Sequence, residues 1–115
     1  MKVYDKAREL VAVLKEEKIY SDFVYWQRQV FDDVRLKEKL MALRQHEFAL
    51  HRLQLRGKDI SEEELANLRQ MYATAREDAV IRSYLDAEYR FSKMMLDIQK
   101  IINNAVPVKG SGKPS

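Results

Sequence analysis

Residues 34–57 read VRLKEKLMALRQHEFALHRLQLRG, and this stretch decides the fold. Its leucines recur at the three- and four-residue spacing of one helix face, and neither proline nor glycine interrupts them before Gly57. Glycine fits the position just beyond a helix C-terminus, where a left-handed backbone is favoured. The stretch therefore predicts one long helix over residues 34–56, about 35 Å long at about 1.5 Å per residue.

Residues that break helices are scarce outside this stretch as well. The chain of 115 residues has three glycines and two prolines, and residues 1–106 contain one glycine and no proline. A β-sandwich or β-barrel needs a turn about every 8–12 residues, usually built with glycine, proline, asparagine or aspartate. The composition therefore excludes these folds and predicts an all-α protein.

The N-terminal part of the chain predicts two further helices. Ser21 is a suitable N-cap for the second of them, and Tyr20 and Tyr25 stand at the positions of a hydrophobic staple. The first helix is expected over about residues 3–18, because apolar residues recur there at spacings of four, three and four: Val3, Ala7, Leu10 and Leu14. The buried face of the second helix is expected to consist of Phe23, Trp26 and Val30.

Capping residues mark the other boundaries. Asp32 or Asp33 can cap the N-terminus of the long helix, because either carboxylate accepts hydrogen bonds from the unpaired N–H groups of its first turn. After the glycine, Ser61 and Glu64 have the spacing of a capping box and predict the start of a fourth helix. Asp78 is the expected N-cap of the fifth.

Two of the five predicted helices are too long for a compact globule. The fifth, over about residues 79–104, would span about 39 Å, whereas a compact domain of this length has a radius of gyration near ~13 Å. We therefore expect residues 1–106 to form one domain, an elongated antiparallel bundle of about five helices. Residues 107–115 are rich in glycine, lysine, proline and serine and are expected to form a flexible C-terminal tail.

The long helix carries more apolar residues than one core can cover. The row expected to face the other helices consists of Leu36, Leu40, Leu43 and Leu50. A second row, at seven-residue spacing, consists of Val34, Met41, Phe48 and Leu55. Because a second apolar row needs a further partner, we expect these four residues to form an oligomer or partner interface. The prediction is a homo-oligomer, with a dimer favoured.

Charge is divided unevenly along the chain. The net charge is only +3, but residues 34–58 carry +5 and residues 59–79 carry −4. If the two helices pack antiparallel, much of this charge is neutralised within the fold, and this is the favoured interpretation. The alternative is a basic stripe that contacts RNA or an acidic partner through Lys37, Arg44, Arg52, Arg56 and Lys58. The interleaved aromatic residues of a base-stacking surface do not accompany this stripe.

Motifs for catalysis or metal binding are missing from the sequence. It has no cysteine, which excludes disulfides, thiolate metal sites and cysteine nucleophiles. His46 and His51 are five positions apart, so they point about 140° apart on a helix and cannot share one zinc ion within it. Glu88 lies near the apolar side of the fifth helix, where a position at the edge of the apolar stripe, or pairing with a basic residue, is favoured over a functional acid. We expect no enzyme, no cofactor, no metal and no small-molecule substrate.

Membrane insertion is not expected either. The longest unbroken apolar run extends from Leu10 to Leu14, far short of the ~20 residues that span a bilayer. The N-terminus leads directly into a charged helix and has no signal-peptide core. The sequence therefore predicts a cytoplasmic protein.

Packing and capping motifs carry a resemblance to a known family. They are Tyr4-x-x-Ala7-x-x-Leu10, Ser21-Asp22-Phe23, the Asp32-Asp33 break and Ile81-x-x-Tyr84-Leu85-x-Ala87-Glu88-x-x-Phe91. With these motifs and its long leucine-rich helix, the chain resembles the YlbF/YmcA family of small helical bacterial regulators, together with the related YheA-like proteins. The similarity covers about residues 3–106.

The resemblance implies an all-helical, self-associating cytoplasmic protein without enzymatic activity. Some members act with partner proteins in a complex that adjusts ribonuclease Y-dependent RNA processing, and so influence competence, sporulation and biofilm formation. Some proteins of that complex are linked to iron–sulfur clusters held by cysteines, and this cysteine-free chain departs from that pattern. The implied function is a regulator or adapter that contacts other regulatory proteins.

Overall fold

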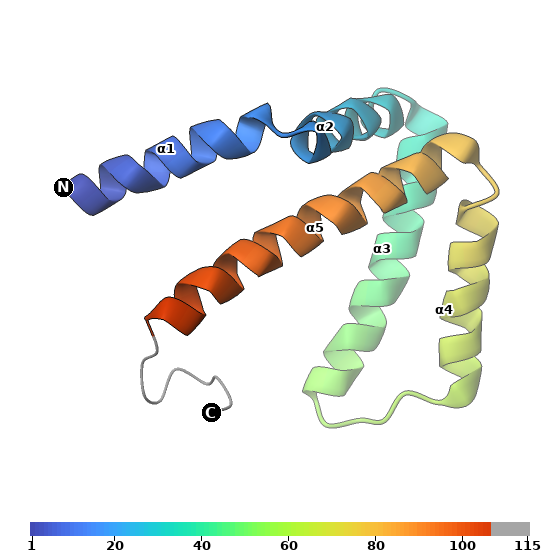
Figure 1. Ribbon diagram of the computed structural model, residues 1–115. Helices are drawn as coiled ribbons and strands as arrows, with labels where there is room; N and C mark the ends of the chain where they lie inside the picture. The colour runs from blue at the N-terminus through green and yellow to red at the C-terminus, as the bar shows by residue number, and fades with distance from the viewer. Residues whose placement is uncertain (107–115) are drawn as a thin grey trace.

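The computed structural model describes residues 1–106, which form five helices and no strand (Figure 1). The helices are α1 (Lys2–Glu16), α2 (Lys18–Phe31), α3 (Val34–Leu55), α4 (Glu62–Ala75) and α5 (Ala79–Ala105). The predicted all-α class and the two long helices are confirmed. The predicted tail, residues 107–115, lies outside the described residues.

Three of the predicted N-caps form as expected. The carboxylate of Asp33 accepts a hydrogen bond from the N–H of Leu36 (3.1 Å) and starts α3. The hydroxyl oxygen of Ser61 accepts from the N–H of Glu64 (3.1 Å) and starts α4. Asp78 caps α5 by accepting from two N–H groups of the first turn, at 2.9 and 3.2 Å. Each cap satisfies donors that a helix N-terminus otherwise leaves unpaired.

Gly57 ends α3 as the sequence predicts. Its φ is +77°, in the left-handed region that favours glycine. The N–H of Gly57 donates to the carbonyl of Gln54 (3.0 Å), and the N–H of Lys58 donates to the carbonyl of Leu53 (3.1 Å). This pair of bonds is a Schellman motif, which satisfies the last carbonyl groups of the helix.

The predicted boundary between α1 and α2 is wrong. The chain breaks at Glu17, whose ψ of 141° is extended, and no side chain caps α2 there. Ser21 lies inside α2, where its hydroxyl donates to the carbonyl of Lys18 (3.1 Å). A serine hydroxyl can bond to a preceding carbonyl within a helix instead of capping one. Tyr20 and Tyr25 also lie within α2 and form no hydrophobic staple.

The five helices pack mainly in two pairs (Figure 1). α2 runs antiparallel to α5, and α3 and α4 form an antiparallel hairpin directed away from them, with α2 leading into α3 at the corner. The radius of gyration is 18.0 Å and the principal extents are 47, 37 and 18 Å, whereas a compact chain of this length would have a radius near ~13 Å. The molecule is therefore extended and flat.

The core lies where the two pairs meet. Val30 of α2 and Ile81 of α5 are completely buried there, and the row expected to face inward is buried as predicted: Leu36, Leu40, Leu43 and Leu50. Aromatic rings extend the contact between α2 and α5, because Phe23 stacks on Phe91 with ring centroids 4.8 Å apart. The predicted buried face of α2 is confirmed, since Phe23 and Trp26 pack against this core.

α1 is the exception to this packing. It buries none of its side chains, and its apolar residues Val3, Tyr4, Leu10, Val11 and Val13 are exposed. The helix forms with the apolar spacing that the sequence predicts, but no other helix within residues 1–106 buries that face. Figure 1 shows α1 extending away from the body of the molecule.

Candidate functional site

The second apolar row of α3, here called the α3 row, consists of Val34, Met41, Phe48 and Leu55. Val34 is 71% exposed, Phe48 59% and Leu55 73%, whereas Met41 is half-buried and packs against the core. At about 100° per residue, the row is centred about 135° around α3 from the buried leucines. α3 therefore presents one apolar face to the core and another to solvent.

The two halves of the α3 row differ in relief. Near its N-terminal end, Val34 and Met41 line an open hollow of about 340 Å³, together with Lys37, Glu38, Ala42 and Gln45. In the C-terminal half, Phe48 and Leu55 are exposed, and the guanidinium of Arg52 lies over the Phe48 ring, 5.1 Å from its centroid. A hollow thus lies at the N-terminal end of α3, and the larger exposed side chains of the row lie at the C-terminal end.

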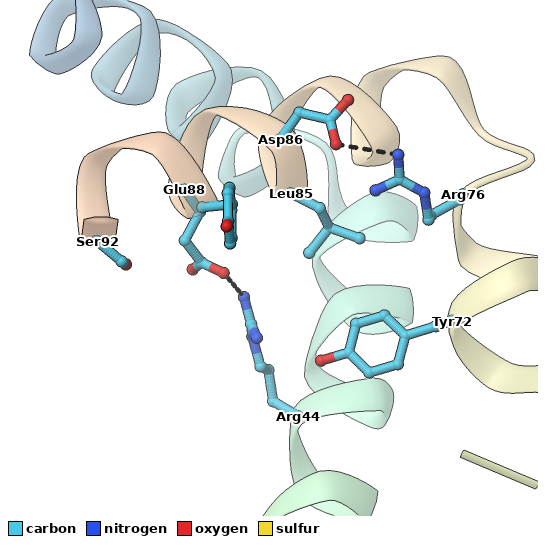
Figure 2. Close-up of a pocket in the computed structure, with 8 residues that line it drawn as sticks. Arg44, Tyr72, Arg76, Leu85, Asp86, Glu88 and Ser92 are labelled. Carbon is cyan, nitrogen blue, oxygen red and sulfur yellow. Dashed lines mark hydrogen bonds and ion pairs between the residues drawn. The ribbon is translucent and has the colours of Figure 1, made fainter. Parts of the chain in front are cut away.

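A polar network joins α3, α4 and α5 beside the core (Figure 2). Its centre is the ion pair between Arg44 of α3 and Glu88 of α5, and the hydroxyl of Tyr84 donates to the second carboxylate oxygen of Glu88 (2.9 Å). Arg44 also lies 3.5 Å from Glu47, whose other oxygen accepts from the hydroxyl of Tyr72 in α4. Of the two favoured interpretations of Glu88, an edge position or pairing with a basic residue, the structure shows the pairing.

An open groove of about 450 Å³ runs along this network. Figure 2 shows Arg76 directed toward Asp86 at one end of it, with an ion pair of 3.0 Å, and Arg44 reaching Glu88 at the other. Both arginines that line the groove are therefore paired with carboxylates. The groove therefore offers no unpaired arginine to an anionic ligand, and its two ion pairs cross-link the helices.

The surroundings of three groups in the polar network shift their pKa values. Burial, and then the hydrogen bond to Glu47, raises the pKa of Tyr72 to about 12. Burial, and then the hydrogen bond to Glu88, raises the pKa of Tyr84 to about 12. Burial alone would lower the pKa of Arg44, but the hydrogen bond and charge of Glu88 outweigh it, and the pKa is raised. At neutral pH both tyrosines are neutral donors and Arg44 is a cation.

Comparison with known proteins places the chain in a family. Residues 3–107 match the family described as "Control of competence regulator ComK, YlbF/YmcA". The chain belongs to the YlbF/YmcA family. The resemblance in its packing and capping motifs is thereby confirmed, and the family description names regulation and no reaction.

Relatives of this YlbF/YmcA member match over most of both chains. A "UPF0342 protein" of Caldicellulosiruptor bescii is 30% identical over 93% of this chain and 90% of its own length. One from Caldicellulosiruptor saccharolyticus is 31% identical over 93% and 89%. A third, from Shouchella clausii, is 33% identical over 86% and 84%.

A solved structure shares the fold of this family member. It is titled "Protein of Unknown Function (DUF964) from Bacillus stearothermophilus" and superposes with a TM-score of 0.81. The match covers 98% of this chain and 100% of that chain, at 18% sequence identity. The likeness supports the five-helix arrangement.

The five basic residues of the predicted stripe differ in their contacts in this YlbF/YmcA protein. Arg44 is tied to its carboxylates and Arg52 lies over Phe48, whereas Lys37, Arg56 and Lys58 are exposed and have no ion pair within residues 1–106. The basic charge of α3 is offset in part by Glu47, Glu88 and, through Arg35, Asp78. No ion pair in the described part of the chain joins α3 to α4, although the two helices are antiparallel.

The histidines do not form a metal site with other residues of this family member. His51 is exposed, and His46 is half-buried with a buried Nε2 that has no hydrogen-bond partner. Over residues 1–106, no three side chains of histidine, aspartate or glutamate lie close enough together to hold a metal ion. None of the helices in that part of the chain is both long enough and apolar enough to cross a membrane.

Two contacts of the polar network have no local signal in the sequence. Tyr72 and Glu47 are 25 positions apart, and Arg76 and Asp86 lie on either side of the turn before α5. Tyr72 packs against the core beside Leu68 and Met71 of α4, and its hydroxyl distinguishes it from them. A tyrosine within an apolar stripe is a residue whose hydroxyl requires a partner when it is buried.

Proposed function

We propose that this protein is a non-enzymatic regulatory adapter that acts through protein–protein contacts of a homo-oligomer, with a dimer favoured. The observation that carries this proposal is the α3 row, in which three of four apolar side chains are more than half exposed. Contiguous exposed apolar surface on a soluble protein marks an interaction site. The bare apolar face of α1 adds a second surface of the same kind.

The free energy gained by burying apolar side chains favours association over an α3 row that stays exposed to water. Complete burial of a valine, leucine or phenylalanine side chain is worth roughly 1.5–3 kcal/mol. Val34, Phe48 and Leu55 each leave most of this gain unused in the single chain. A symmetric contact recovers it twice, because both copies bury the same residues.

The regulatory part of the proposal rests on the family. Its description concerns control of a competence regulator, and the resemblance extends this to RNA processing, sporulation and biofilm development through contacts with other regulatory proteins. We place the protein in the cytoplasm for the same reason. The polar network supports a structural role for its residues, since its arginines and tyrosines are held in mutual contacts.

The oligomeric state tests the first half of this proposal. Sedimentation velocity of the whole chain at micromolar concentration is expected to give the mass of a dimer. Phe48→Ser is expected to shift the population toward monomer, whereas Tyr89→Ser, which removes an equally exposed aromatic side chain from α5, is not. A wild-type chain that remains monomeric at about 100 µM would overturn the homo-oligomer.

Co-purification at native expression level tests the second half. A regulatory protein that is identified with the wild-type chain and lost with a surface variant supports the adapter. Filter binding to single-stranded RNA at low salt tests the alternative, in which the basic stripe contacts phosphates through Lys37, Arg44, Arg52, Arg56 and Lys58. We expect no binding, whereas an affinity that falls steeply as salt rises would replace the adapter with an RNA-binding module.

A further inference from the structure

We infer that a second copy of this chain docks on the α3 row with its own α3 antiparallel, and that the two-fold axis passes beside Gln45. This inference rests on the proposed homo-oligomer and adds the orientation and pairing of its helices. Three observations carry it: the spacing of the α3 row, the charges beside it and its relief.

The spacing makes the α3 row a helix-pairing seam. Its members recur every seven residues, which keeps them on one side of two helices that wind around each other with a left-handed twist. The row runs for about 32 Å along α3. In an antiparallel pair centred on the row, Val34 faces Leu55 of the partner subunit, and Met41 faces Phe48 of the partner subunit.

The charges beside the α3 row favour the antiparallel direction. Glu38, Gln45 and Arg52 each follow a row member by four residues, so they form a second line along the same face. Antiparallel pairing places Glu38 opposite Arg52 of the partner subunit, and Gln45 opposite Gln45 of the partner subunit. Parallel pairing would instead place the two lines on opposite sides of the seam, so neither Glu38 nor Arg52 would meet an opposite charge of the other line.

The relief of the surface favours the same direction. The hollow lies at the N-terminal half of the row, beside Val34 and Met41, and the larger exposed side chains of Phe48 and Leu55 lie at the C-terminal half. Antiparallel pairing brings these larger side chains of each copy to the hollow of the other. Parallel pairing would bring hollow to hollow. The stacking of Arg52 on Phe48 holds the guanidinium at the seam, where it can meet Glu38 of the partner subunit.

Cysteine cross-linking tests the orientation directly, because the natural chain has no cysteine to interfere. Gln45→Cys alone is expected to form a covalent dimer on oxidation, since this position meets its own copy at the axis. Val34→Cys and Leu55→Cys are each expected to remain uncross-linked when alone and to cross-link when mixed. Self-cross-linking of Val34→Cys or Leu55→Cys would overturn the antiparallel orientation.

Charge reversal provides a second, independent test. Glu38→Arg and Arg52→Glu are each expected to weaken dimerisation by about tenfold or more, because two symmetric pairs become repulsive. The double variant E38R/R52E is expected to recover the dimer. Lys37→Glu, on the neighbouring side of the hollow, is the control and is expected to change the dissociation constant less than either single variant.

The two tests separate this inference from the proposed function. A stable dimer that shows none of these cross-links and ignores the charge reversals would overturn the α3 pairing but leave the homo-oligomer standing. A monomer that nevertheless co-purifies with another regulatory protein through the α3 row would overturn both the pairing and the homo-oligomer, and would make a different protein the occupant of the row.

Discussion

The guanidinium of Arg44 and the carboxylate of Glu88, 44 positions apart in the chain, form an ion pair that joins the α3–α4 hairpin to α5. Each side chain is 30% exposed, so the pair is screened less than a fully solvated one. The hydroxyl of Tyr84 donates to the same carboxylate. Glu88 is thus the shared acceptor through which two pairs of helices are held in one arrangement.

Loss of Glu88 is expected to destabilise the fold. Glu88→Gln should lower the free energy of unfolding by about 1 kcal/mol, because Arg44 and Tyr84 lose a charged acceptor. Arg44→Met should cost a similar amount, and the double variant less than the sum, with a coupling of about 1 kcal/mol. Urea denaturation followed by circular dichroism, at one fixed protein concentration, measures all three.

A matched control for this cycle is the exposed pair of Lys6 and Glu9 on α1, whose side chains are 70% and 63% exposed. Its coupling is expected to stay below about 0.5 kcal/mol. If the coupling of Arg44 and Glu88 is no larger than that of the control pair, the two residues do not hold the helices together.

From the raised pKa values of Tyr72 and Tyr84, we expect the folded state to lose stability at alkaline pH. The folded pKa values of Tyr72 and Tyr84 are raised to about 12, whereas an unfolded tyrosine titrates near ~10. The folded state therefore favours the neutral form, so the stabilisation is fully present below about pH 10 and is lost as the pH rises toward 12. Urea denaturation between pH 8 and 12 is expected to show this fall.

Single phenylalanine variants assign the alkaline effect. Tyr84→Phe and Tyr72→Phe should each flatten the decline in unfolding free energy above about pH 10. Tyr89→Phe should leave it unchanged, because the side chain of Tyr89 is exposed on α5. An identical decline in all three variants would contradict the assignment to the buried hydroxyls.

From the lowered pKa of Asp78, we expect the folded state to lose stability at acidic pH. Burial would raise the pKa of Asp78, but the N–H groups of Ile81 and Val80, with the nearby Arg35, outweigh it and lower the pKa. The stabilisation is therefore present above the unfolded pKa of about 3.9 and is lost as the pH falls through the lowered folded value. Asp78→Ala should cost about 1–2 kcal/mol at pH 7 through loss of the cap.

The pH dependence separates the charge of Asp78 from its capping role. The difference in unfolding free energy between the wild type and Asp78→Ala should shrink at low pH, where the wild-type carboxyl is protonated. Asp78→Asn keeps an acceptor for the α5 N-terminus and should lose only a few tenths of a kcal/mol at pH 7. A gap that is constant with pH would show that the carboxylate charge contributes nothing.

Replacement of Gly57 is expected to destabilise the protein through backbone conformation alone. A side chain added at this position meets no atom within 4 Å, but the φ of +77° lies in the left-handed region. Gly57→Ala should therefore destabilise the protein by about 1 kcal/mol, and Gly57→Asn by less. Lys58→Ala, the next residue along, should change the free energy by less than about 0.5 kcal/mol. Equal effects at the two positions would contradict the strain argument.

Helix boundaries were predictable where a local interaction makes them. Asp33, Ser61 and Asp78 each accept from an N–H group two or three residues ahead, and Gly57 closes a motif within six residues. Such interactions join residues at a short, fixed spacing in the chain, so they can be recognised in the sequence. The inward row of α3 was predictable for the same reason, because helical periodicity fixes which leucines share a face.

The break at Glu17 and the polar network were not predictable in this way. Glu17 has no capping side chain to mark the break, and Ser21 has the residue type of a cap but bonds back within α2. The pairing of Arg44 with Glu88 depends on how α5 passes α3, which no spacing within either helix reveals. Sequence reasoning could therefore name Glu88 as a residue with a partner, but not the partner.

The bare α1 has a consequence for hydrogen exchange. An isolated helix of about 15 residues is only marginally stable in water, and α1 has that length and no buried side chain. Its amide hydrogens are expected to exchange rapidly while the helix is uncovered, and slowly once another molecule packs on it. Deuterium uptake over residues 2–16 would then follow occupancy of this helix in time, whatever the occupant and without any label on the protein.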